Sequence, residues 1–239
     1  ASDVYKRQLI DWQVSNLLTG ESYCERVAAL TRQATDQIFA MAGRVTKRDE
    51  KTAAAIFESL LLTGIAMSFT KTSRPGSGTE HIMAHFWECM ELLDSKTPNY
   101  HGEDVGVTTL IMLRYYEALA RLPQVTAHPE ICNWDEIYSI YGPLAPDVQK
   151  LNTPDTITDG IAPRWIEACW PQIRRIVQSV PSYDVCLAAM RQAGCKTTIE
   201  EVGKAPDFVD ISFRFHPYMR RRLSLKRVSH MLDLPEDLF

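Results

Sequence analysis

The chain has 239 residues, of which 45% are hydrophobic and 23% are charged, values typical of a globular protein with a sizeable core. This composition excludes a disordered chain, a collagen-like repeat and a small disulfide scaffold. The formal charge of −4, from 26 basic and 30 acidic residues, argues against a broad basic face and predicts no nucleic-acid partner. The six cysteines form no C-x-x-C pair, which predicts reduced thiols in a cytoplasmic protein.

The first residues differ in character from the rest of the chain. Residues 1–8, ASDVYKRQ, have no helical face and no capping residue, whereas residues 9–18 carry apolar side chains at helical spacing. We therefore expect residues 1–8 to be foreign or an artefact, and a natural upstream part to be missing. No linker or low-complexity tract divides the remainder, so residues 9–239 are expected to form one helical domain.

Periodic apolar residues, caps and breakers predict a succession of helices. They are expected over residues 21–42, 49–69, 77–93, 105–122, 134–141, 143–150, 163–180, 182–193 and 218–232. Residues 53–69 approach the length of a membrane span, but Glu58 interrupts them, so a buried core helix is expected and no span. Residues 209–215 alternate like a strand without a partner and are interpreted as helix or extended linker. The predicted class is all-α.

A loop rich in serine, threonine and glycine carries two cations, Lys71 and Arg74, and runs directly into a predicted helix. Ser77 and Glu80 fit the S-x-x-E capping box, which would start that helix at Ser77. Free backbone N–H groups and the positive end of the helix dipole would then lie beside the cations, a combination suited to an anion or a phosphate. An ordinary solvated turn with a good cap explains the same residues equally well.

Three histidines lie close together in the sequence. His81 and His85 are four residues apart and share a helix face, and His101 follows in the next loop. Neutral imidazoles suit zinc, nickel or iron, and an open three-ligand site polarises an alcohol or carbonyl oxygen. Separate packing roles for each histidine are the alternative, and spacing alone favours them.

A basic run occurs near the end of the chain. It comprises Arg220, Arg221 and Arg222, with Lys226 and Arg227 shortly after. A solvated helix face is the favoured interpretation. A clamp for the phosphate of a substrate or partner is the alternative.

Several of these motifs occur together in a known family. They are SRPGSGTEH at residues 73–81, HFWE at 85–88 and HGEDVG at 101–106, with DW at 11–12, TGESYC at 19–24 and RRRLSL at 220–225. In this combination the chain resembles the glycerol-1-phosphate dehydrogenase branch of the iron-containing alcohol dehydrogenase superfamily, over nearly all of residues 9–232. The resemblance implies the C-terminal helical half of a dehydroquinate synthase-like or iron-containing alcohol dehydrogenase fold, with the N-terminal α/β domain missing.

The resemblance also implies roles for the histidines. His81 and His101 match two metal ligands of the family, and His85 matches a catalytic position near the nicotinamide. The family's third ligand is an aspartate just upstream of residue 11. Asp3 is close to that place, but it belongs to the octapeptide that we expect to be foreign.

For the substrate, the resemblance implies contacts from Lys71, Ser73 and Arg74. The family reaction is the reduction of dihydroxyacetone phosphate to sn-glycerol 1-phosphate, with a divalent metal and with NAD(H) or NADP(H) bound mainly by the missing domain. The expected partner is therefore a small phosphorylated substrate, a homo-oligomer is left open, and the fragment alone is expected to be inactive.

Two other classes of function were weighed against this one. A non-catalytic helical interaction module would give His81 and His101 packing roles and bind no metal. A phosphohydrolase of the HD type would use paired His-Asp ligands, and the sequence contains no adjacent His-Asp pair.

Overall fold

The computed structural model of the protein describes residues 4–47 and 49–239. Throughout these residues the regular elements are helices, and the one β contact among them is an isolated bridge between Ala127 and Leu232. The predicted all-α class is confirmed. The α-helices are α1 (Val4–Thr19), α2 (Glu25–Met41), α3 (Glu50–Thr70), α4 (Thr79–Leu93), α5 (His101–Arg121), α6 (Trp134–Tyr141), α7 (Ala145–Asn152), α8 (Pro163–Gln178), α9 (Tyr183–Gln192), α10 (Pro206–Phe215) and α11 (Leu225–Val228).

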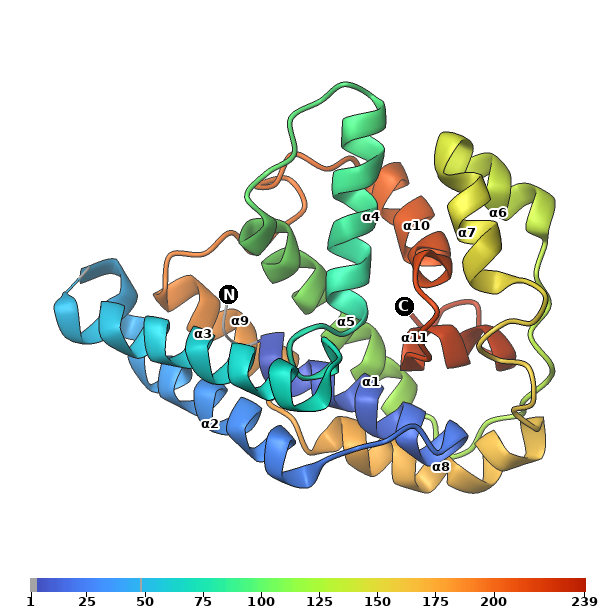
Figure 1. Ribbon diagram of the computed structural model, residues 1–239, viewed down its shortest axis with the longest axis horizontal. Coiled ribbons are helices and arrows are strands. Elements are labelled where there is room, and N and C mark those ends of the chain that lie inside the picture. The colour runs from blue at the N-terminus through green and yellow to red at the C-terminus, as the bar shows by residue number, and fades with distance from the viewer. Residues whose placement is uncertain (1–3, 48) are drawn as a thin grey trace.

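Helix α5 runs through the middle of the molecule, between two hydrophobic cores (Figure 1). One core joins α1, α5, α8 and α11, with Trp170 at its centre. The other joins α4 and α5 to α6, α7 and α10, with Phe86 and Trp87 fully buried. Helices α2 and α3 lie side by side as an arm that extends from this body (Figure 1). The arrangement places the loop after α3 against α1 and directly before the start of α4.

Several predicted boundaries shift for identifiable reasons. Helix α5 begins at His101, a turn before the predicted start at residue 105, because Glu103 and Asp104 favour a helix N-terminus although they are not apolar. The segment that alternates like a strand lies in α10, which begins with Pro206 at its first position. Helix α1 begins at Val4, inside the octapeptide. The foreign origin of residues 1–8 stays a prediction, and residues 1–3 lie outside the described part of the chain.

The helix predicted over residues 218–232 is wrong. The chain instead forms a short 3-10 turn (His216–Met219), an extended stretch and the single turn of α11. The Ser224 hydroxyl caps this turn by accepting the backbone N–H of Arg227 at 3.1 Å. Arg220, Arg221 and Arg222 therefore lie on irregular backbone, and Lys226 and Arg227 lie in the single turn of α11, so the basic run does not form one solvated helix face.

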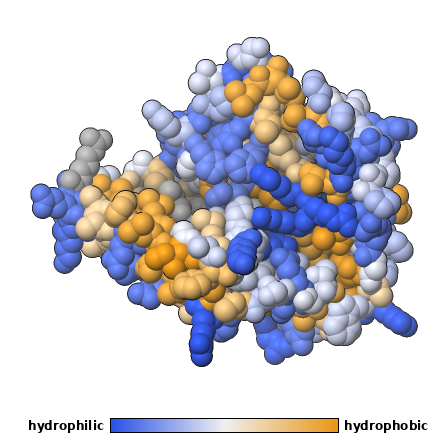
Figure 2. Space-filling view, viewed as in Figure 1, coloured by the Kyte–Doolittle hydropathy of each residue, from blue (hydrophilic) through white to orange (hydrophobic). Residues whose placement is uncertain are grey.

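Helix α3 was predicted to be a buried core helix, and this prediction is wrong. Its buried residues are small and mostly polar (Thr52, Ser59, Thr63 and Ala66), and the Ser59 hydroxyl donates to the Ala34 carbonyl of α2 at 3.1 Å. Its large apolar residues face outward, and Figure 2 shows them as a hydrophobic patch on the arm. The exposed residues are Phe57, Leu60, Leu61, Ile65 and Phe69.

By length and composition alone, α3 could cross a bilayer. Its most apolar window has a mean hydropathy of 1.6 and is only 22% buried. One such helix is weak evidence for a membrane protein, because helices of other proteins pass the same test.

A buried carboxylate on α1 connects four helices. Asp11 accepts hydrogen bonds from the backbone N–H of Thr79 at 2.7 Å, the Tyr116 hydroxyl at 2.8 Å and the backbone N–H of Leu225 at 2.8 Å. Burial and the neighbouring Glu80 raise the pKa of Asp11 to about 6. These bonds fix the first residues of both α4 and α11.

Candidate metal and substrate site

The candidate site begins at the N-terminus of α4, which the structure starts at Thr79 with Gly78 as its cap. The predicted cap at Ser77 is wrong, because the cap residue is Gly78, which has no side chain to accept a hydrogen bond. The glutamate half of the capping box does form, since Glu80 accepts the Gly78 N–H at 2.9 Å. Because Asp11 accepts the next N–H, that of Thr79, two of the donors expected to bind an anion are already used by the protein's own carboxylates.

In each of the three histidines, the Nδ1 atom forms a hydrogen bond with a glutamate carboxylate. The distances are 2.8 Å from His81 to Glu80, 2.9 Å from His85 to Glu88 and 2.6 Å from His101 to Glu88. An ionised carboxylate only accepts hydrogen bonds, so each Nδ1 carries the proton. In a neutral imidazole of this tautomer, Nε2 has a lone pair that can bind a metal.

The histidine rings lie together, as the metal interpretation requires. The ring centroids of His81 and His101 are 5.4 Å apart, and the His85 ring stacks on the His101 ring at 4.8 Å. One ligand atom from each of His85, Glu88 and His101 lies within 4.8 Å of the other two. This set of two imidazoles and a carboxylate suits a divalent metal, and it does not include His81, one of the two predicted ligands. Sequence reasoning did not include Glu88 in the site.

The charges around the histidines support ionised glutamates. Burial acts to raise the pKa of Glu88, but hydrogen bonds from His101 and His85 outweigh it and lower that pKa. Glu80 is fully buried, yet the hydrogen bond and the charge of His81 likewise hold its pKa below the usual value. The two carboxylates are therefore available as acceptors for Nδ1–H at neutral pH.

Arg74 has a structural role in the loop. Its guanidinium donates to both carboxylate oxygens of Glu21, at 2.8 and 2.6 Å, and to the Leu223 carbonyl at 3.0 Å. These bonds use all three guanidinium nitrogens, and the side chain is buried. Lys71 is exposed and takes a left-handed backbone conformation, with φ of 54°, as the C-cap of α3.

Arg222 enters the site from the far end of the chain. Its Nη2 atom donates to the Ser73 hydroxyl at 2.6 Å, across 149 residues of sequence. Burial, together with the nearby charges of Arg74 and Arg220, lowers the pKa of Arg222. No ion pair among the described residues includes Arg222, so this cation lacks a carboxylate partner there. The basic run contained the signal, but the sequence did not show which arginine meets the loop.

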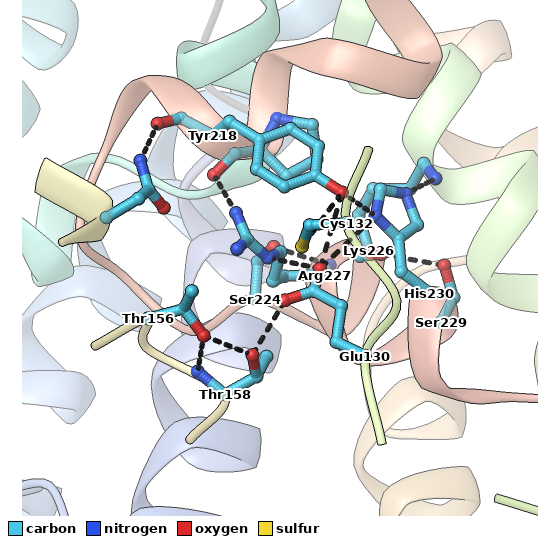
Figure 3. A network of polar contacts seen from close by, with 12 residues as sticks. Glu130, Cys132, Thr156, Thr158, Tyr218, Ser224, Lys226, Arg227, Ser229 and His230 are labelled. Atoms are coloured by element: carbon cyan, nitrogen blue, oxygen red, sulfur yellow. Dashed lines mark hydrogen bonds and ion pairs between the residues drawn. The ribbon is translucent and has the colours of Figure 1, made fainter. Parts of the chain in front are cut away.

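Other members of the basic run are buried, which corrects the expectation of a solvated face. Lys226 is 3% exposed and Arg227 is fully buried. Arg227 pairs with Glu130 at 2.6 Å and lies over the Tyr218 ring (Figure 3). These two cations belong to a separate polar cluster.

The fold and the site together define a helical domain with a histidine cluster suited to a metal. No protein-family model matches the chain. Over 97% of its length the chain is 26% identical to the glycerol-1-phosphate dehydrogenase (NAD(P)+) of Geobacillus stearothermophilus, covering 50% of that protein. It is 34% identical to the Bacillus licheniformis protein of the same name, over 60% of this chain and 34% of that protein.

The match to the Bacillus subtilis protein of that name covers 92% of this chain and 46% of that protein, at 26% identity. The chain thus spans about a third to a half of the length of these curated relatives. The predicted resemblance is confirmed: over nearly its whole length the chain is similar to proteins named glycerol-1-phosphate dehydrogenase.

Proposed function

We propose that this chain is the metal- and substrate-binding part of an NAD(P)-linked glycerol-1-phosphate dehydrogenase. The observation that carries the proposal is the set of three neighbouring imidazoles, each with Nδ1 on a carboxylate, in a chain whose relatives bear that name. In the oxidative direction, a proton leaves the C2 hydroxyl of glycerol 1-phosphate and a hydride leaves C2. The products are dihydroxyacetone phosphate and reduced NAD(P).

We assign the metal to His81 and His101 through their Nε2 atoms, with zinc, nickel or iron as the candidate ions. A bound ion supplies Lewis-acid polarisation of the reacting oxygen. Glu80 and Glu88 hold the two rings in the tautomer that this role needs. Asp3, the residue close to the place expected for the third ligand, lies outside the described residues.

We assign His85 to the reacting end of the substrate. Its ring stacks on that of His101, and Glu88 holds its Nδ1–H. The free Nε2 can therefore accept the proton of a nearby hydroxyl or return it. We assign binding of the nicotinamide cofactor mainly to the α/β domain that the family resemblance implies, which corresponds to the part of the relatives not aligned with this chain.

For the phosphate group we propose Arg222 with Ser73 and Lys71. A planar guanidinium donates two parallel hydrogen bonds to a phosphate, and Arg222 lacks a carboxylate partner among the residues that the structure describes. Arg74 serves here as the anchor that holds the loop through Glu21.

Zinc binding to the chain tests the metal site directly. Titration calorimetry should detect one zinc per chain, and His81→Ala and His101→Ala should each weaken or abolish it. His128→Ala is the matched control, because this histidine lies outside the cluster and its Nδ1 contacts the Pro129 carbonyl. Equal zinc affinity in all four proteins would refute the assignment.

The activity needs the rest of the enzyme. The chain would be joined to the part of the Geobacillus stearothermophilus relative that lies outside the match, and oxidation of NADH and NADPH would be followed by absorbance. We expect oxidation that depends on both dihydroxyacetone phosphate and added metal, and that is lost in Arg222→Met. A folded, metal-loaded fusion that oxidises neither cofactor would contradict the proposed function.

A further inference from the structure

A second cluster, around α11, connects a carboxylate, an imidazole and an amine in sequence. The Nζ atom of Lys226 lies 2.7 Å from Nε2 of His230, and Nδ1 of His230 lies 3.6 Å from Oε1 of Glu130. Figure 3 shows these contacts running from Glu130 through His230 to Lys226. The amine donates an N–H to Nε2, so in the neutral ring the imidazole proton is on Nδ1, which also lies 3.3 Å from the Tyr218 hydroxyl. Enzymes activate nucleophiles with this order of groups.

The amine of Lys226 is held against aromatic rings. Its Nζ atom lies 4.4 Å from the ring centroid of Phe213 and 5.4 Å from that of Tyr115. None of the ion pairs in residues 4–47 and 49–239 includes Lys226. The side chain therefore lacks the direct carboxylate contact that keeps a buried lysine protonated.

The surrounding charges reinforce this effect. Burial lowers the pKa of Lys226 to about 7; Glu130 acts to raise it, and Arg214 and Arg227 lower it further. Burial and the charge of Lys226 lower the pKa of His230 to about 4, so the imidazole is neutral at pH 7. A large fraction of the Lys226 amine is neutral at the same pH and keeps its lone pair.

The amine borders a pocket of about 420 Å³, within the range of small-molecule sites. Both Lys226 and His230 line it. The apolar part of the lining comes from Phe213, Ile137 and Leu234. A small aromatic ring suits a pocket of this size and lining, and a carbonyl carbon is the group with which an amine reacts.

We propose that Lys226 is a reactive amine that forms an imine with small aromatic aldehydes in this pocket, with His230 as its base. The nitrogen lone pair attacks the carbonyl carbon, a C–N bond forms and the C=O π bond breaks, giving a carbinolamine. His230 takes a proton from the nitrogen and returns it to the hydroxyl, which leaves as water. One aldehyde and one amine thus give one imine and one water, without a redox change.

The chain contains its own control for burial. Lys204 is as buried as Lys226, but its Nζ atom pairs with Glu91 at 2.5 Å and Asp104 at 3.4 Å. A paired lysine stays charged and unreactive. Buried lysines that differ in their partners should therefore differ in reactivity.

Reductive trapping tests the proposal on the intact chain. Benzaldehyde and sodium cyanoborohydride would be added at pH 7, and benzylated lysines located by digestion and mass spectrometry. At that pH a lysine with a pKa near 7 has about a thousand times more neutral amine than an ordinary one. Allowing for restricted access, we expect Lys226 to be labelled about tenfold or more faster than exposed Lys96 and Lys150, and Lys204 to stay unlabelled.

A substitution of His230 tests whether labelling of Lys226 depends on this base or only on the access of the aldehyde to the amine. His230→Gln should slow labelling of Lys226 several-fold at pH 7 while leaving Lys96 unchanged, and circular dichroism would verify the fold. Labelling of Lys226 no faster than that of Lys204, in a wild-type chain whose surface lysines react, would overturn the proposal. Unchanged labelling in folded His230→Gln would overturn the role of the base.

Discussion

Two clusters in this protein pair glutamate with histidine, and they differ in where the imidazole points its free nitrogen. In the first, Glu88 contacts the Nδ1 atoms of His85 and His101. The side chain of His101 is 45% exposed, and none of the hydrogen bonds described for this residue involves its Nε2 atom. In the second, Glu130 is 3% exposed and the imidazole of His230 turns its free nitrogen to an amine. In the roles that we propose, the same pair of groups prepares an open ligand site in one place and a buried relay in the other.

The difference shows what burial adds to a carboxylate–imidazole pair. At the surface, the carboxylate fixes the tautomer of the imidazole, and solvent or a ligand compensates the charge of the pair. In the interior, each charge must be compensated by a neighbour, and the pKa of Glu130 falls to about 2 because hydrogen bonds and the charge of Arg227 outweigh its burial. Substitutions should consequently affect stability in the buried cluster and affinity in the open one.

The largest effect is expected for Arg227→Met, which removes the partner of Glu130. Breaking a buried ion pair from one side leaves an uncompensated charge and costs about 3–5 kcal/mol. Urea unfolding would measure it. The control is Arg214→Met, whose exposed pair with Glu136 should contribute about 1 kcal/mol or less. Equal losses in the two variants would remove the distinction between the clusters.

Lys226→Met should change the pH dependence of stability. The pKa of Lys226 is about 7 in the folded chain, against an ordinary value of 10.5 for a solvated lysine, so the unfolded chain binds more protons between these values. Stability of the wild type then rises with pH in that window, by about 1.4 kcal/mol per unit at most. Relative to Lys226→Met, a gain of about 2 kcal/mol is expected from pH 7 to 9 in urea unfolding.

The neighbours of Lys226 do not titrate in that window. His230 has a pKa of about 4 and Glu130 one of about 2, and the arginines stay charged. Lys150→Met, at an exposed position, is the control. Parallel pH profiles for wild type and Lys226→Met would show that the amine titrates normally.

Glu88→Gln should act on affinity. Loss of a carboxylate that orients metal-binding histidines weakens metal binding by about 10–100-fold, and zinc calorimetry would measure this. Stability should change little, because this cluster is partly exposed. If zinc affinity is unchanged, Glu88 does not position the histidines. If zinc binding is lost completely, Glu88 is itself a metal ligand. Glu58→Gln on α3 is the control.

The smallest effect is expected outside both clusters. Leu61→Gln on the exposed face of α3 should change the free energy of unfolding by no more than about 0.5 kcal/mol, because the side chain is about half exposed. A loss above 2 kcal/mol would mean that this face is covered in solution, which sedimentation would reveal as self-association.

Local patterns predicted the fold class and much of the site. The i, i+4 spacing placed His81 and His85 on one helix, and the apolar periods located most helices to within a turn. Contacts across the loop to His101 and Glu88, or from Ser73 to Arg222, have no local signal, because nothing in the periodicity encodes which distant segments meet.

Burial was the harder quantity to predict. Helix α3 has one small polar face and one large apolar face, and the sequence reveals both without showing that the polar face meets α2. Lys226 and Arg227 were expected in solvent because cations are rarely buried unless paired. Their compensating partners, Glu130 and His230, are identified only by the three-dimensional packing.

The bonds of Asp11 also constrain the order in which this chain can fold. Its three partners lie 68, 105 and 214 residues away, so the loop that closes last spans nearly the whole chain. Contacts at such separations form slowly because chain entropy must be lost first. We expect the starts of α4 and α11 to become fixed when α1 docks, because their first N–H groups bond to Asp11. The histidine cluster and the amine relay should therefore mature late and together.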